Sequence, residues 1–338
     1  MKRQGSPKVA IACQGGGSHA AFTAGLLSRL LEPDFAERYE LVALSGTSGG
    51  AMCAALAWAG LISGGPEDAR RRLAGFWRDL EASDPVDLAM NYWSLWFARL
   101  PVTLEMSPYV FEPLAELTLR ALLEKHLRLE GLSAMRPAQP QLLVGATNIQ
   151  SGERTVFDGR TLSYDELVAS AAVPLLYRAV KAGNALYWDG LFSTNPPVRE
   201  FTDLEPVPDE IWVVQINPQR REEEPKNVRD IVDRRNELAG NLSLAQELYF
   251  IERVNRLRSR HGTLQAKYKH ITIRVVELTL ELDYASKLDR SERLIRALIA
   301  HGAERAALFF DERSLWPRPD SLPAKTVRPA LAGKAAVK

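Results

Sequence analysis

"VALSGTSGGAM" (residues 42–52) contains an apolar run, a serine framed by glycines, and small residues that can open a helix. A Gly-x-Ser-x-Gly pattern on a sharp turn between a strand and a helix is typical of a serine nucleophile. The pattern alone is weak evidence, because small residues also gather in ordinary loops. The surrounding segments must therefore distinguish a catalytic turn at Ser48 from a structural loop.

The segments on either side of this turn predict an α/β fold. Lys8–Cys13 is a compact apolar run that ends at Gly15–Gly17, and a helix is expected next because apolar residues recur at helical spacing, at Ala20, Ala24, Leu27 and Leu31. Leu41–Ser45 predicts a second buried strand, and Gly49–Leu61 predicts a second helix. Strands and helices that alternate with short connections are typical of a mostly parallel central sheet flanked by helices.

The rest of the chain is expected to extend this sheet and to add helices. Further strands are predicted at Gln141–Thr147, Arg154–Phe157, Ala185–Trp188, Ile211–Ile216 and His270–Val276. A helical and aromatic insertion is expected over 66–136, and a helical C-terminal third over 227–316. No clean linker divides residues 1–316, which predicts a single domain. Residues 317–338 are rich in proline, alanine and basic side chains, which predicts a disordered tail.

Composition and charge argue against several classes of function. The formal charge of +1 does not suit a dedicated nucleic-acid binder. The two cysteines form no zinc-ligand pattern, and their small number indicates a reducing compartment. The first residues do not form a signal peptide, and no apolar stretch is long enough to cross a bilayer. The sequence therefore predicts a cytoplasmic protein whose contact with a membrane is peripheral.

The glycine loop and the serine turn are expected to face each other. In a right-handed βαβ unit, the loops that leave two parallel strands lie at the same edge of the sheet. Backbone N–H groups of Gly15–Gly17 would then lie beside the Ser48 hydroxyl. This arrangement is what acyl transfer requires, because the hydroxyl attacks a carbonyl and the amides hold the developing oxyanion.

A dinucleotide site is the competing interpretation of the glycine loop. Gly15, Gly17 and Ala20 match the pattern G-x-G-x-x-A. That fingerprint needs an acidic residue at the end of the second strand, where it binds the ribose. The nearest acid, Glu40, precedes the strand instead, and no G-K-[ST] follows the glycines. A nucleotide site is therefore disfavoured.

A serine nucleophile needs a base. The five histidines are in no recognisable catalytic setting. Asp189 ends a predicted strand in "ALYWDGLFSTNPP" (residues 185–197) and is followed by a glycine and a polar loop. An aspartate can accept the serine proton directly if partial burial raises its pKa, although an Asp-Gly pair is also a common turn.

Taken together, these residues resemble the patatin-like phospholipases. The motifs "GGGSHAAFTAGLL", "GTSGG", "ASAAVPLLYRAV" and "YWDGLFSTNPP" occur in that family's order and approximate spacing, from residue 8 to about residue 217. The resemblance implies a three-layer α/β fold and a lipid acyl hydrolase that needs no metal or cofactor. It implies that Ser48 is the nucleophile and Asp189 the base, without a catalytic histidine. It further implies an oxyanion loop and a nucleophile elbow, formed by Gly15, Gly16 and Gly17 and by Gly46 and Gly50, respectively.

The chain departs from the family pattern after the glycine loop. The family usually has arginine and glycine where this sequence has His19 and Ala20. A histidine is mostly neutral at pH 7, which weakens the expected stabilisation of an oxyanion or phosphate. The residue after Asp189-Gly190 is Leu191, which is a milder change.

Two segments could contact a membrane or a second copy of the chain. Residues 91–111 mix aromatic side chains with Arg99, which suits either a lid at a membrane surface or the core of a cap beside the site. The stretch 227–260 carries Arg253, Arg256, Arg258 and Arg260, which anionic lipid could contact. Glu247 and Glu252 lie among these arginines, which favours a solvated, salt-bridged face; a dimer surface is the other interpretation.

The expected partner is thus a lipid ester, and two alternatives remain open. One is an α/β-hydrolase esterase in which Ser48 and Asp189 act with His261, His270 or His301. The other is a non-catalytic lipid-binding protein that kept the fold. The sequence does not decide the head group of the lipid or whether the chain forms homo-oligomers.

Overall fold

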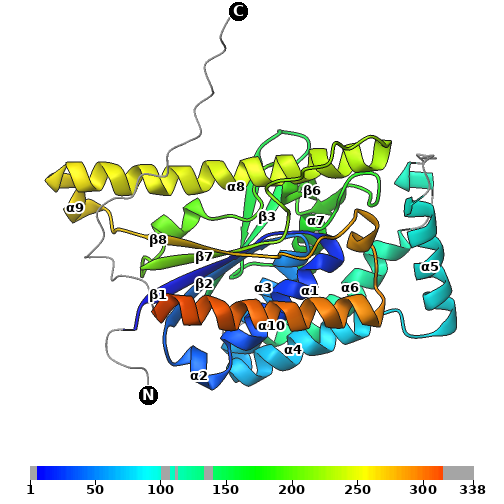
Figure 1. Cartoon of the computed structure of the whole chain (residues 1–338), viewed down its shortest axis with the longest axis horizontal. Helices are drawn as coiled ribbons and strands as arrows, with labels where there is room; N and C mark the ends of the chain where they lie inside the picture. The colour runs from blue at the N-terminus through cyan, green and yellow to red at the C-terminus, as the bar shows by residue number, and fades with distance from the viewer. Residues whose placement is uncertain (1–5, 100–106, 111–112, 133–139, 315–338) are drawn as a thin grey trace, which may run out of the picture.

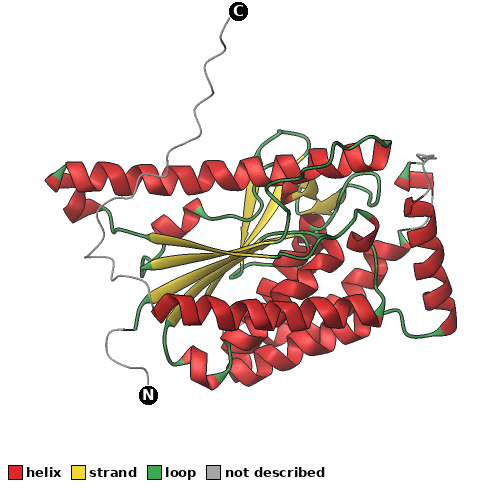
Figure 2. Cartoon of the chain, in the orientation of Figure 1, coloured by secondary structure: helices red, strands yellow, loops and turns green. Residues whose placement is uncertain are grey.

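The computed structural model describes residues 6–99, 107–110, 113–132 and 140–314, and within them the chain forms one sheet. Its strands are β1 (Lys8–Cys13), β2 (Glu40–Thr47), β3 (Gln141–Asn148), β4 (Arg154–Asp158), β5 (Val180–Ala182), β6 (Ala185–Asp189), β7 (Glu210–Gln215) and β8 (Thr272–Glu277). Their order is β5-β6-β3-β2-β1-β7-β8, and β4 also pairs with β3. The sheet is a twisted layer between helices (Figure 2).

The sheet is parallel through its centre, as predicted. β1 lies between β2 and β7, β2 pairs with β3, and β7 pairs with β8, in each case in parallel. β4, β5 and β6 are antiparallel and lie on the β3 side of the sheet. Cys13 of β1 is opposite Gly46 of β2, so the loops that leave these two strands meet at one edge.

Helices cover both faces of the sheet and produce the predicted three layers (Figure 1). They are α1 (Ala21–Leu30), α2 (Pro33–Ala36), α3 (Gly49–Gly64), α4 (Pro66–Leu80), α5 (Pro85–Arg99), α6 (Leu114–Leu127), α7 (Tyr164–Ser170), α8 (Val228–Arg260), α9 (Gly262–Lys267) and α10 (Glu292–Ser314). α1, α3, α4 and α10 lie on one side, and the long α8 runs across the other. Short 3₁₀ turns that matter for the site are η1 (Gly17–Ala20), η4 (Gly190–Phe192), η5 (Arg199–Asp203) and η6 (Ala285–Lys287).

Residues of β1 alternate between two apolar cores on opposite faces of the sheet, as the pleat of a strand requires. Val9, Ile11 and Cys13 belong to the larger core with α1, α3 and α10. Ala10 and Ala12 belong to the smaller core beneath α8. A strand that is buried on both faces explains why Lys8–Cys13 is an uninterrupted apolar run.

The insertion predicted over 66–136 has two kinds of helix. α4 and α6 contribute to the larger core through Phe76, Trp77, Leu123 and Leu127. α5 instead exposes Tyr92, Trp93, Trp96 and Phe97. The interpretation of residues 91–111 as the core of a cap is therefore wrong for these side chains. Phe111 and the predicted disordered tail 317–338 lie outside the described residues.

The C-terminal third differs from the sequence prediction at one acid. Residues 228–260 form a single helix, α8, and Glu252 makes the expected exposed ion pair with Arg256. Glu247 is buried instead, where it pairs with Arg154 and accepts hydrogen bonds from the N–H groups of Val198 and Arg199. Glu247 thus ties α8 to the loop after β6. Sequence pattern also missed three short elements, α2, α7 and β5.

We expect the contact between α1 and α10 to tolerate no side chain at Gly302. A Cβ there would lie 2.0 Å from the carbonyl oxygen of Phe22, so backbone would have to move. Gly302→Ala should lower the free energy of unfolding by about 1–3 kcal/mol, as measured by urea denaturation. Gly262→Ala is the control, because a Cβ at Gly262 meets no atom within 4 Å. Equal stabilities of the two variants would contradict this packing.

Candidate active site

Ser48 occupies a strained turn between β2 and α3. Its φ of 55° lies in the left-handed region, which is costly for a residue with a Cβ. The backbone on either side of Ser48 is also crowded: a Cβ at Gly46 would lie 2.5 Å from the oxygen of Gly50, and a Cβ at Gly50 would lie 2.3 Å from the oxygen of Cys13. The sharp turn predicted from Gly46, Ser48 and Gly50 is present.

Hydrogen bonds fix the orientation of this turn. The backbone N–H of Ser48 donates to Ser170 Oγ at 3.0 Å, and that hydroxyl donates to the oxygen of Gly145 at 2.6 Å. Ser170 is the last residue of α7, which the sequence analysis did not identify as a helix. Thr47 Oγ1 donates to the oxygen of Thr194 at 2.6 Å, which joins the turn to the loop after β6.

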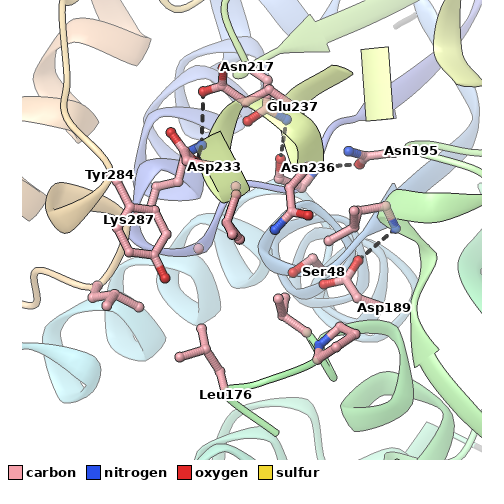
Figure 3. Close-up of a pocket in the computed structure, with 18 of the residues that line it drawn as sticks. Ser48, Leu176, Asp189, Asn195, Asn217, Asp233, Asn236, Glu237, Tyr284 and Lys287 are labelled. Carbon is pink, nitrogen blue, oxygen red and sulfur yellow. Dashed lines mark hydrogen bonds and ion pairs between the residues drawn. The ribbon is translucent and has the colours of Figure 1, made fainter. Parts of the chain in front are cut away.

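Asp189 ends β6 beside the Ser48 turn, because β6 pairs with β3 and β3 pairs with β2 (Figure 3). Its side chain is fully buried. Oδ1 accepts a hydrogen bond from the N–H of Leu191 at 2.8 Å, whereas Oδ2 has no partner among the described residues.

Burial raises the pKa of Asp189 to about 7, against the opposing effects of the Ser48 hydroxyl and the Leu191 N–H. Ser48 and Asp189 lie side by side in the same cavity (Figure 3), although no hydrogen bond of ordinary geometry joins their side chains among the described residues. Catalytic hydrogen bonds often tighten only when substrate is bound.

The glycine loop is held from two sides. The N–H of Gly15 donates to Asn195 Oδ1 at 2.8 Å, and Asn217 Nδ2 donates to the oxygen of Gly15 at 3.0 Å. The Gly15 N–H, one of the three amides expected to bind an oxyanion, is thus already occupied. The N–H groups of Gly16 and Gly17 have no acceptor among the described residues.

A buried polar network supports this loop. Gln14 Oε1 accepts from the N–H groups of Ile216 and Asn217, at 2.9 and 2.8 Å, and Gln14 Nε2 donates to Asn241 Oδ1 at 2.9 Å. Asn241 lies on α8, so three distant segments meet at Gln14. Sequence reasoning missed these amides, because single glutamine and asparagine side chains form no local pattern that marks them.

His19 is buried in η1 and does not line the cavity beside Ser48. Its Nε2 lies 2.7 Å from Ser286 Oγ, which donates its own proton to the oxygen of Asp283. Nε2 is therefore the donor. Burial, followed by the nearby charge of Lys287, lowers the pKa of His19 to about 3. The expectation of a neutral histidine at pH 7 is confirmed, and this side chain holds η1 against η6.

Ser48, Asp189 and the glycine loop line one cavity of about 140 Å³. One wall is apolar and comes from the segment after α7 and from η4, with Val173, Pro174, Leu175, Leu176 and Leu191. The opposite wall comes from α8 and from residues 284–288, which include η6. It carries the polar side chains Asp233, Asn236, Glu237, Tyr284 and Lys287, together with the apolar Val232 and Leu288. Figure 3 shows Leu176 and the labelled residues of the polar wall on different sides of the cavity.

The remaining histidines lie away from this cavity. His261, His270 and His301 are not among its lining residues, and His126 contacts Asp79 instead. A triad with a late histidine therefore finds no geometric support. Among the described residues, no cluster of histidine, cysteine and acidic side chains could hold a metal ion.

The mouth of the cavity is apolar and strained. Leu175 and Leu176 are exposed, and Leu175 has a φ of 73°, which is unusual for a leucine.

Within residues 6–99, 107–110, 113–132 and 140–314, no helix combines the length and apolar character needed to span a bilayer.

The buried carboxyl group of Asp189 should cost stability above neutral pH. The folded-state pKa of about 7 lies above the usual value for an aspartate, so the stability that the protonated group contributes is lost as the pH rises through 7. Asp189→Asn mimics the protonated form. It should stabilise the fold on the order of 4 kcal/mol at pH 8, and far less at pH 5.

Urea denaturation of both proteins at the two pH values measures this difference. Asp203→Asn makes the same change at an exposed aspartate at the end of η5 and is the matched control. A stability gain for Asp189→Asn that is the same at pH 5 and pH 8 would contradict the raised pKa.

Two solved structures are similar to this chain. The crystal structure of VipD from Legionella pneumophila is 13% identical and covers 91% of this chain and 67% of that chain, with a TM-score of 0.45. The type III effector ExoU of Pseudomonas aeruginosa is 17% identical and covers 92% of this chain and 54% of that chain, with a TM-score of 0.40. This chain thus spans about half of ExoU. No curated protein gives a significant match.

The family profile described as patatin-like phospholipase matches residues 11–202, which is more than half of the chain. The matched region contains Ser48, Asp189 and the glycine loop, and it ends before α8. The chain belongs to the patatin-like phospholipase family.

Proposed function

We propose that this protein is a serine-dependent acyl hydrolase of lipid esters in which Ser48 is the nucleophile and Asp189 the general base. Membership of the family supports a lipid hydrolase. The observation that carries the dyad is its juxtaposition: a serine in a strained turn and a fully buried aspartate line the same cavity. The pKa of about 7 suits Asp189 for accepting a proton near neutral pH.

In the first half of the reaction, Ser48 Oγ attacks the ester carbonyl carbon, and its proton passes to the Asp189 carboxylate. The carbonyl oxygen becomes an oxyanion, which the N–H groups of Gly16 and Gly17 stabilise because they carry no other acceptor. The tetrahedral intermediate then expels the alcohol, which takes the proton from Asp189. The acyl group remains on Ser48.

In the second half, water replaces the alcohol. Asp189 accepts a proton from the water as its oxygen attacks the acyl carbonyl, and the same N–H groups hold the second oxyanion. Collapse of this intermediate releases the fatty acid and returns the proton to Ser48. Gly15 contributes indirectly, since Asn195 and Asn217 hold both polar groups of its backbone and so fix the direction of the next two amides.

The substrate is expected to reach the cavity from a lipid surface. α5 exposes a cluster of aromatic side chains, and Tyr109 and Val110 are exposed nearby in the chain. Aromatic side chains bind well at the boundary between head groups and acyl chains. We propose that the described part of residues 91–111 makes peripheral contact with lipid, with the chain otherwise in the cytoplasm.

Fluorophosphonate labelling of the purified protein tests the nucleophile. The wild type should be labelled, because an activated serine attacks phosphorus. Ser48→Ala should abolish labelling and lower kcat on p-nitrophenyl butyrate by about 10³-fold or more. Ser259→Ala changes a serine whose hydroxyl only donates to the oxygen of Arg256 on α8, and it should retain both activities.

Circular dichroism must show that all three proteins are folded. Folded wild type that is labelled neither alone nor with lipid vesicles would overturn the proposal and favour the non-catalytic alternative. Labelling that persists in Ser48→Ala would place the nucleophile elsewhere.

The pH dependence of kcat/KM tests the base. The proposed mechanism needs the ionised form of Asp189, so kcat/KM for p-nitrophenyl butyrate should rise with pH through a midpoint near 7. Asp189→Asn should remove this dependence together with most of the activity. A wild-type midpoint near 4 would show that an ordinary, solvated carboxylate is the base.

A further inference from the structure

The long helix α8 packs on the sheet with a largely polar side and turns apolar side chains outward. Its buried residues include Asp233, Glu237, Asn241 and Glu247. Figure 1 shows α8 as the outermost layer on its side of the sheet. On that outer side, seven large apolar side chains are between 38% and 59% exposed: Val228, Ile231, Leu238, Leu242, Tyr249, Phe250 and Leu257. A surface helix normally has the opposite arrangement, with its apolar residues toward the core.

Most of these exposed residues follow a heptad spacing. Alternating steps of three and four residues from Val228 reach six further positions, and all seven side chains are exposed. The six positions are Ile231, Arg235, Leu238, Leu242, Ala245 and Tyr249. This spacing aligns the residues in one narrow seam, which is how two helices pack in a coiled coil. At 1.5 Å per residue, the seam of residues 228–249 is roughly 30 Å long.

The charges around the seam favour a second helix over a membrane. A helix that lies in a membrane surface has a broad apolar face and basic side chains along its polar flanks. Here the charges are separated along the axis instead. The exposed run 222–224, which is three glutamates, precedes the helix, and the exposed Arg253 and Arg260 lie near its other end. An anionic membrane would repel the acidic end, whereas an antiparallel copy of the chain brings each acidic end to a basic end.

The seam is also complementary to itself in the antiparallel direction. A twofold axis between Leu238 and Leu242 places each of these leucines beside the other one in the second copy. The same axis places Ile231 opposite Tyr249. The single arginine of the seam then lies opposite its single alanine, which leaves room for the aliphatic part of the arginine. A twofold dimer requires such a surface, because both copies contribute the same patch.

We propose that the seam of α8 is a homodimer interface in which the α8 helices of two copies pack antiparallel. The inference does not depend on the proposed hydrolysis. It gives α8 two functions on opposite sides. The buried side holds Gln14 below the glycine loop through Asn241, and the exposed side joins the two copies.

Sedimentation velocity of the full-length protein over about 1–100 μM tests the dimer. The wild type should sediment with twice the mass of one chain at the upper concentrations. Leu238→Glu with Leu242→Glu places like charges on both sides of the axis and should raise the dissociation constant about 100-fold or more. Wild type that remains monomeric throughout this range would overturn the inference.

A second double variant tests the direction of the helices. Leu238→Glu with Leu242→Lys places opposite charges together across the axis only when the helices are antiparallel, because each charge meets its own kind in a parallel pair. Its dissociation constant should be at least tenfold lower than that of the Glu/Glu variant. Equal dissociation constants for the two variants would contradict the antiparallel packing.

The matched control is Leu308→Glu, which makes the same change at an exposed leucine on α10. It should leave the dissociation constant unchanged, and circular dichroism must show that every variant is folded. A loss of the dimer in Leu308→Glu that equals the loss in the Glu/Glu variant would show that α8 is not the interface.

Cosedimentation with vesicles of phosphatidylcholine and phosphatidylglycerol separates a second copy from a lipid surface. The wild type and the Glu/Glu variant should bind the vesicles equally, because the proposed lipid contact is on α5. Monomeric wild type whose vesicle binding is lost in the Glu/Glu variant would assign the seam to lipid and overturn the inference.

Discussion

The close approach of α3 to the end of β1 is the constraint on which the site depends. Gly50 brings the first turn of the helix against the backbone oxygens of Cys13 and Gln14, at distances that exclude a side chain. The chain between β2 and α3 must then turn within one residue, and Ser48 takes the left-handed conformation that this requires. The same contact places the glycine loop after β1 beside the serine.

The site is completed by segments that follow the family-matched region. Gln14 and Gly15 are held by Asn217 and by Asn241 of α8, and Glu247 of α8 anchors the loop that carries Asn195. α8 therefore connects the glycine loop to the loop after β6 across the sheet. These polar contacts explain why a long helix with a largely polar sequence packs there. The family motifs supply the proposed reacting groups, and later segments supply their support and the polar wall.

Asp189 illustrates the opposition between stability and chemistry at this site. Burial leaves Oδ2 without a partner and raises the pKa of the carboxyl group. Such a group destabilises the fold when it is ionised, yet the raised pKa is what would allow an aspartate to act as a base without a histidine. The cost is sustainable because the surrounding strands and helices are extensively buried on both faces of the sheet.

The sequence by itself determined the strands and turns that depend only on their own residues. Apolar runs predicted β1 and β2, and the spacing of glycines predicted the turn at Ser48, because a pleated buried strand and a crowded turn each impose their own residue types. Only the tertiary structure decided the rest. The burial of Glu247 and the raised pKa of Asp189 depend on which distant atoms surround each side chain and exclude water from it. No local pattern records such an environment.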